Sequence, residues 1–172
     1  MDSPLMGCSW LVVSLAKSIT GAVGSHLWLE PALAGYVGYV LTDLGSGVYH
    51  WAIDNYGDES TPLVGAQIEA FQGHHKWPWT ITKRQFANNL HALQQFHAWA
   101  HGTKSKLPPL VVSLQDMGVL VSRKQHGEHH RAPYNNNYCI VSGAWNKVLD
   151  ESKAFEVLEM VLYFKLGVRP RS

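Results

Sequence analysis

Histidine is the residue type whose number and spacing stand out in this chain. The sequence holds ten histidines among 172 residues, and eight of them fall in short-range groups. The eight are His50, His74, His75, His97, His101, His126, His129 and His130. Imidazole is the commonest metal ligand among protein side chains. The grouping therefore predicts that the chain binds metal.

Several of these residues are spaced four apart, which is the spacing of neighbours on one face of a helix. Residues i and i+4 project from a helix one turn apart, so two such side chains can hold one ion together. Three pairs have this spacing: His97 with His101, His126 with His130, and His50 with Asp54. Extending the last pair backwards adds Asp43 and Gly47 to the same stripe. We expect the glycine to leave space beside the site, and Glu128, inside HGEHH, to act as a hydrogen-bond acceptor at its rim.

The number of ligands predicts two ions but leaves the metal open. Eight neutral imidazoles and a carboxylate exceed what one ion can use. The two cysteines, Cys8 and Cys139, are too few for a thiolate zinc site or an iron–sulfur centre. Imidazole suits zinc, iron, copper and nickel alike, so the type of ligand does not choose among them.

The N-terminal third is apolar enough to predict a membrane anchor. Leu5–Val23 contains one charged residue, Lys17, and Pro31–Ile53 contains one, Asp43. About 20 largely apolar residues suffice to cross a bilayer. The link between the segments is short, so we expect an antiparallel transmembrane hairpin. A soluble domain with one basic face is the alternative, and no transit peptide is visible before the apolar run.

The rest of the chain reads as helices in a polar, histidine-rich region. We expect helices over Leu63–Phe71, Arg84–His101, Leu110–Arg123 and Asp150–Leu166. The last is amphipathic, with Asp150 or Ser152 as its cap and an apolar face formed by Phe155, Leu158, Val161 and Leu162. The expected fold is all-α: one domain over residues 1–172, with spans in 5–53, a metal-binding region in 54–149 and an amphipathic helix over 150–166.

The net charge and the expected membrane location narrow the range of possible functions. The formal net charge is only +1, which argues against a nucleic-acid binder. A metal site at the lipid–water boundary, supplied with an apolar substrate, points to oxidation of lipid chains. Unactivated C–H bonds need a metal–oxygen oxidant, and iron is the usual carrier of that chemistry. Basic residues between Lys76 and Arg131 would face anionic head groups, or would form only a solvated rim.

Four longer motifs resemble a known family. They read DLGSGVYHWAIDNYG, FQGHHKWPWTIT, QQFHAWAHG and QHGEHHRAPYNNNYCIVSG, and the resemblance extends over most of the chain. They are similar to the Kua-type lipid desaturases, a family that includes animal plasmanylethanolamine desaturase and plant plastid fatty acid desaturase 4. The details resemble the plant branch, which introduces a trans double bond near the carboxyl end of palmitate on phosphatidylglycerol.

The resemblance carries expectations about the site and its partners. It implies that the eight grouped histidines bind two non-haem irons, with Asp54 and Asn89 at matching motif positions as secondary candidates. It also implies dioxygen, a membrane phospholipid substrate and an external electron donor. That donor would be ferredoxin in a chloroplast membrane, the expected location, or cytochrome b5 in the endoplasmic reticulum.

One departure from the family pattern lies inside the chain. Family members carry a long apolar region between the segments that resemble FANNLHAL and QQFHAWAH, whereas here Leu93 is followed directly by Gln94. The second pair of transmembrane spans is therefore expected to be missing. Two alternatives to a desaturase remain: a lipid hydroxylase with the same metal chemistry, and a non-catalytic membrane anchor or interaction isoform.

Overall fold

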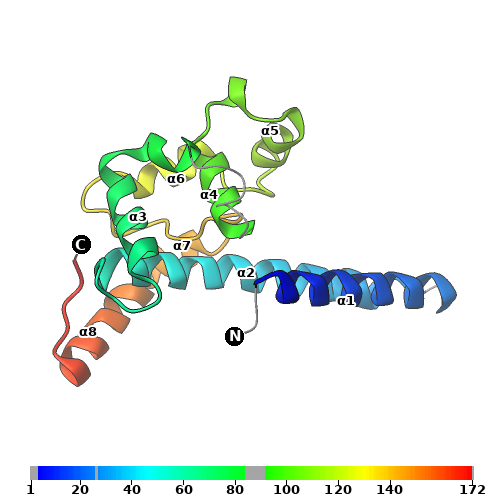
Figure 1. The fold of residues 1–172 in the computed structure, drawn as a ribbon, viewed down its shortest axis with the longest axis horizontal. Coiled ribbons are helices and arrows are strands. Elements are labelled where there is room, and N and C mark those ends of the chain that lie inside the picture. The colour runs from blue at the N-terminus through cyan, green and yellow to red at the C-terminus, as the bar shows by residue number, and fades with distance from the viewer. Residues whose placement is uncertain (1–3, 26, 84–91, 172) are drawn as a thin grey trace. The chain divides into compact units, whose positions relative to one another are not determined.

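The computed structural model describes residues 4–25, 27–83 and 92–171 as a series of helices (Figure 1). No strand occurs among these residues, so the expected all-α class is confirmed. The elements are α1 (Pro4–Ser25), α2 (Leu29–Asn55), α3 (Gly65–Lys76), η1 (Pro78–Lys83), α4 (Ala92–His101), η3 (Lys104–Lys106), α5 (Pro109–Asp116), α6 (Arg123–His129), α7 (Asn146–Glu151) and α8 (Ala154–Leu166).

The chain divides into two compact units, Met1–Leu41 and Thr42–Ser172. The first unit contains α1 and the beginning of α2, and the chain reverses direction between them (Figure 1). Both expected spans fall within these helices. Among the described residues, however, none of the helices reaches the combined length and apolarity that a membrane crossing requires. The transmembrane hairpin therefore stays a prediction.

The second unit has its apolar core on two sides of the C-terminal half of α2. On one side, Trp51 packs with Tyr138 and Phe155, and the rings of Trp51 and Phe155 stack with centroids 5.1 Å apart. On the other side, Ile53 packs with Ile68 and Phe71 of α3. Helix α2 is thus the central element of this unit, which fixes the direction in which its polar residues face.

An irregular segment over residues 138–145 lies along α2 and is held by side chains of that helix. The Asp43 carboxylate, which is fully buried, accepts backbone N–H groups of Val141, Ser142, Gly143 and Trp145. One turn further on, the Ser46 hydroxyl accepts the N–H of Ile140. The segment has no regular ladder, so these side chains satisfy backbone groups that would otherwise be buried without partners.

The predicted stripe of Asp43, Gly47, His50 and Asp54 is indeed the buried face of α2. The expected role of its glycine is wrong. A Cβ atom at Gly47 would lie 2.5 Å from the Sγ atom of Cys139, so the glycine makes room for the crossing segment and not for the metal site. Cys139 is a fully buried free thiol whose pKa is raised by burial, as expected for an inert core residue.

One of the expected helices is shorter than predicted, and another is described only in part. The helix expected over Leu110–Arg123 ends at Asp116, because Gly118 takes a positive φ of 73° and the chain turns. Ser122 then begins α6 with a capping box in which its hydroxyl accepts the N–H of Gln125. The helix expected over Arg84–His101 is described only as α4, since residues 84–91 lie outside the described part.

The single helix expected over Asp150–Leu166 is also wrong. The chain forms α7 and α8, which are separated at Lys153 by a left-handed backbone with φ of 55°. Asp150 is not a cap, because its carboxylate accepts the backbone N–H of Asn137. Within the expected apolar face, Phe155 and Leu162 pack on the core, whereas Leu158 and Val161 are exposed.

The first expected helix, Leu63–Phe71, is displaced towards the C-terminus. The structure has α3 over Gly65–Lys76, which carries His74 and His75 in its last turn. Gly65 begins the helix where its backbone touches Glu59, and a Cβ atom there would lie 2.1 Å from the Glu59 carbonyl oxygen. The longer helix matters for the site, because it holds both histidines on a regular element.

Candidate metal centre

Four helices of the second unit bring all eight grouped histidines together. Helix α2 supplies His50 and Asp54, α3 supplies His74 and His75, α4 supplies His97 and His101, and α6 with its C-terminal residue supplies His126, His129 and His130. They form two sets, within each of which the candidate ligand atoms lie within 4.8 Å of one another. Helical spacing alone predicted pairs of ligands, and the fold brings these pairs together into the two sets.

The five-histidine group consists of His74, His97, His101, His126 and His130. The Nε2 atom of His126 lies 2.9 Å from that of His97, 3.0 Å from that of His101 and 3.1 Å from that of His130. At most one nitrogen of each such pair can carry a hydrogen between them. Four imidazoles that aim the same ring nitrogen at one point are arranged as ligands of a cation.

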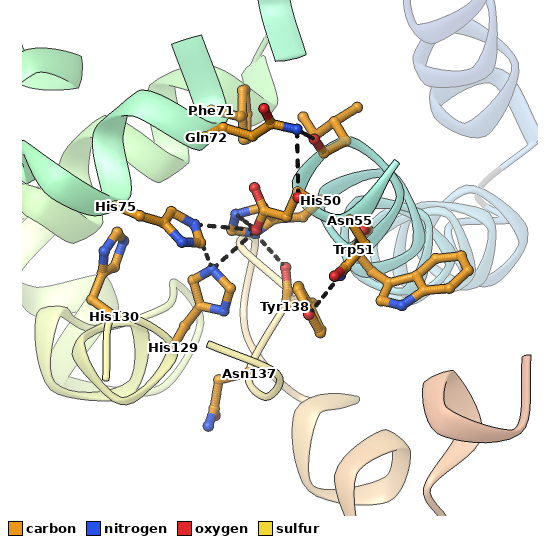
Figure 2. Close-up of polar contacts among 12 residues, drawn as sticks. His50, Trp51, Asn55, Phe71, Gln72, His75, His129, His130, Asn137 and Tyr138 are labelled. Carbon is orange, nitrogen blue, oxygen red and sulfur yellow. Dashed lines mark hydrogen bonds and ion pairs between the residues drawn. The ribbon is translucent and has the colours of Figure 1, made fainter. Parts of the chain in front are cut away.

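The histidine–aspartate group consists of His50, Asp54, His75 and His129. The Nε2 atoms of the three histidines each lie 3.2 Å from the same oxygen, Oδ2 of Asp54. Figure 2 shows the three imidazoles pointing toward one another from different elements. This group offers three nitrogens and a carboxylate, a donor set that suits iron and other divalent transition metals.

Backbone carbonyls fix the orientation of one histidine in the first group and two in the second. The Nδ1 atom of His50 bonds to the carbonyl of Tyr138 at 3.0 Å, and that of His129 bonds to the carbonyl of Asn136 at 2.7 Å. His74 bonds in the same way to the carbonyl of Phe71. A carbonyl accepts, so Nδ1 carries the hydrogen and Nε2 keeps its lone pair for a metal.

Within the described part of the chain, several buried polar atoms of these residues form no hydrogen bond, which supports metal binding. They include Nε2 of His50, Nε2 of His74 and both carboxylate oxygens of Asp54, whose Oδ2 atom has the three imidazole nitrogens near it. A buried carboxylate among neutral imidazoles is costly unless a positive charge compensates it. A cation between the imidazoles and Asp54 would satisfy all of these atoms, so the donor set fits the metal that the sequence predicts.

The environment lowers the pKa of six of the eight grouped histidines, which favours their neutral form: His74, His97, His101, His126, His129 and His130. Burial lowers the pKa of His101 to about 3 and that of His129 to about 4, with further lowering by charge on neighbouring histidines. Burial by itself would raise the pKa of Asp54, but His50, His129 and His75 around it bring the pKa well below its usual value. Neutral imidazoles beside an ionised carboxylate are the protonation states that bind metal.

Three further residues that the sequence analysis singled out, Asp43, Glu128 and Asn89, have different outcomes. Asp43 does not reach either histidine group, because its carboxylate is used by the backbone of residues 141–145. Glu128 forms an ion pair with Arg131 at the surface and is not the expected acceptor at the rim. Asn89 lies outside the described residues.

Sequence reasoning missed the groups that orient the ligands. The carbonyls of Phe71, Asn136 and Tyr138 belong to the backbone, and no side-chain pattern marks them. Ser46, which holds the segment that carries the Tyr138 carbonyl, was also missed. Its position three residues after Asp43 and four before His50 was the available signal, since it places the hydroxyl on the same helix face.

The fold and the site together define a class of protein. It is a helical protein with two adjacent histidine groups arranged to hold metal. The chain belongs to the lipid desaturase domain family, whose model matches residues 39–95 and 92–172. The sequence-based resemblance is therefore confirmed. No solved structure matches the chain significantly.

Individual relatives agree with this family. The chain is 71% identical to fatty acid desaturase 4, chloroplastic, of Arabidopsis thaliana, and the match covers 96% of this chain and 62% of that protein. It is 64% identical to fatty acid desaturase 4-like 2, chloroplastic, of the same plant, with 96% and 72% covered. It is 28% identical to plasmanylethanolamine desaturase of Myxococcus xanthus, with 94% and 70% covered. The chain thus spans less than two thirds of the first of these relatives.

The matches also bear on the internal departure. The family model matches in two pieces that meet at residues 92–95. Each of the three alignments extends over 200 positions, more than the 172 residues of the chain. Part of each aligned relative therefore has no counterpart here, and the break in the family match falls where Leu93 meets Gln94.

Proposed function

We propose that this chain is a membrane-associated lipid desaturase that holds two non-haem iron ions. The observation that carries the proposal is the pair of adjacent ligand sets, five histidines in one and three histidines with Asp54 in the other. Membership of the lipid desaturase family supports the same conclusion. The eight grouped histidines and Asp54 are the proposed ligands.

Bound iron with dioxygen would supply the oxidising power to remove two hydrogens from a saturated acyl chain, giving one double bond and two waters. The balance needs two electrons and two protons from outside, so an electron-donor protein such as ferredoxin or cytochrome b5 is part of the proposal. The chain's own residues bind and position the irons. The carbonyls of Tyr138 and Asn136 hold His50 and His129 in the ligating orientation.

The substrate is proposed to be an acyl chain of a membrane phospholipid, with palmitate on phosphatidylglycerol as the specific candidate. The plant relatives are named as chloroplastic fatty acid desaturases, which supports both the reaction and a chloroplast membrane as the location. Exposed apolar side chains on the first unit support contact with lipid; they include Val23, Leu29, Leu33, Tyr36, Val37 and Leu41.

The break in the family match favours a second candidate, a chain that binds metal but does not desaturate. Both candidates predict iron, so metal content and product must be measured separately. The full chain would be expressed in a host that lacks the activity, next to a version carrying the internal segment of its plant relative. We expect about two irons in each, and an unsaturated product at least from the longer version. A chain without bound iron would overturn the proposal.

Single substitutions test the ligand assignment. His97→Ala and His129→Ala remove one ligand from each group and should each lower the iron content of the purified chain. His26→Ala is the matched control, because His26 stands outside the eight grouped histidines. Equal iron loss in the control would refute the assignment, and zinc in place of iron in an active chain would refute the oxidative chemistry.

A further inference from the structure

A large cavity opens beside the five-histidine group. Its volume is about 860 Å³, within the range of about 300–1,000 Å³ that is typical of small-molecule sites. Residues of η1, α4, the segment 102–108 and the first residue of α6 line it. His101 is part of its wall and also part of the five-histidine group. A molecule in this cavity would therefore lie next to the proposed metal ligands.

The chemistry of the wall has two parts. Apolar surface comes from Trp79, Trp99 and Leu107, together with two prolines. Positive charge comes from Lys106 and Arg123, and none of the lining residues that the structure describes is acidic. Neither cation has an ion-pair partner within the described part of the chain, whereas Lys104 nearby pairs with Asp116. A ligand with an apolar chain and an anionic group fits this wall.

The histidine–aspartate group has a much smaller opening. A cavity of about 140 Å³ reaches Asp54 and His75, and Gln72, Tyr134 and Arg171 also line it. That volume is well below the range for a drug-sized ligand, so a long acyl chain does not fit there. Of these two cavities, the larger one has room for a lipid tail.

We propose that the cavity beside His101 is the lipid site, with the acyl chain against Trp79 and Trp99 and the anionic head group at Lys106 and Arg123. This inference rests on the proposed function and deepens it. It assigns substrate approach to the five-histidine group and makes the two cations specificity-determining residues for anionic phospholipids. It also places the bound lipid in the same cavity as His101, next to the proposed metal ligands.

Binding of brominated lipids tests the site without any turnover. Bromine atoms on an acyl chain quench tryptophan fluorescence on contact, and Trp79 and Trp99 line the cavity. The full chain in detergent would be titrated with brominated phosphatidylglycerol and with brominated phosphatidylcholine of the same acyl chains. We expect saturable quenching, about tenfold tighter for the anionic lipid, because a hydrogen bond to a charged group has about that effect.

Matched variants identify the residues responsible. Arg123→Gln should remove most of the preference for phosphatidylglycerol, while Lys124→Gln, which changes the same charge one residue away from the cavity wall, should keep it. Trp99→Phe should reduce the quenched fluorescence. Free glycerol 3-phosphate should compete only weakly, since it lacks the apolar chain.

Three results would overturn the inference: equal affinity for both lipids, equal effects of Arg123→Gln and Lys124→Gln, or quenching unchanged by Trp99→Phe. Iron content measured on the same samples separates this inference from the proposed function. Normal iron with no lipid preference refutes the lipid site alone. Selective lipid binding by a chain that takes up no iron refutes the proposed function and leaves the lipid site standing.

Discussion

Asp43 is the residue whose replacement tests most directly how the metal centre is held in place. Its carboxylate is fully buried and accepts backbone N–H groups of Val141 at 3.2 Å, Ser142 at 2.8 Å and Gly143 at 3.0 Å on one oxygen, and of Trp145 at 3.3 Å on the other. The segment that it holds also presents the Tyr138 carbonyl to His50. Asp43→Ala should therefore loosen the segment and misorient a proposed ligand.

The magnitude follows from the donors left behind. Each buried N–H without an acceptor costs about 1–3 kcal/mol, and hydrogen bonds to a charged acceptor lie at the upper end. Two of the four bonds are long, and water entering the space would satisfy some donors, so the expected total loss is about 3–5 kcal/mol. Asp43→Asn keeps an oxygen for three donors but turns an amide toward Trp145, so a loss of about 1–2 kcal/mol is expected.

The assay is denaturant unfolding of the full chain in detergent, followed by metal analysis of the folded fraction. Asp116→Ala is the control, because Asp116 forms an exposed pair with Lys104, and such pairs contribute about 1 kcal/mol or less. We expect the order of stability Asp116→Ala above Asp43→Asn above Asp43→Ala, with iron lost first from the group that contains His50. If Asp43→Ala is as stable as the control, the segment is held by other contacts and this reasoning is wrong.

Three further predictions test packing, metal binding and pH. Gly47→Ala should destabilise the chain by about 1–3 kcal/mol, as measured by unfolding, because its Cβ atom would clash with Cys139, and adding Cys139→Ala should restore part of the loss. Asp54→Asn should reduce the iron content from about two to about one per chain, since only its own group contains the carboxylate; loss of both irons would contradict two separate sites. For the metal-free chain, the pKa values of about 3 for His101 and about 4 for His129 lie below the value of about 6.5 in the unfolded chain. The unfolded state therefore binds more protons than the folded state below pH 6.5. The free energy of unfolding should fall in that range by about 1.4 kcal/mol per pH unit for each such histidine. Unfolding curves that coincide at pH 7.5 and 5 would refute the pH prediction.

The sequence could predict which residues form the site but not how they divide between two groups. His97 and His101 lie together because helical spacing of four puts them on one face. His74 and His75 are adjacent in the sequence and belong to different groups, since successive residues of a helix point about 100° apart. Their division depends on which helices approach α3 from each side, and that is a property of the tertiary packing.

Breaks in helices and backbone interactions were the other parts that the sequence did not reveal. The chain interrupts the expected C-terminal helix at Lys153, where neither glycine nor proline marks the left-handed turn. Asp43 was expected on the same helix stripe as His50 and Asp54, and a carboxylate in an apolar segment is costly. The cost is real, but it is offset by four backbone N–H groups from residues 98 to 102 positions further along the chain. Contacts of that range leave no local pattern.

The break in the family match lies close to the proposed lipid site but leaves the metal ligands together. The match breaks at residues 92–95, in the first turn of α4, the helix that carries His97 and His101, yet all eight grouped histidines still meet in two compact sets. The histidines come from α2, α3, α4 and α6, and the described contacts join α4 to α6 and to η1. The metal ligands therefore depend on packing within the second unit. The cavity beside His101 is lined by residues of η1 and of α4, and the break falls in the first turn of α4. An internal segment at this place would change the walls of the proposed lipid site more than the positions of the metal ligands. We therefore expect this chain to keep its metal content and to differ from its longer relatives in lipid turnover.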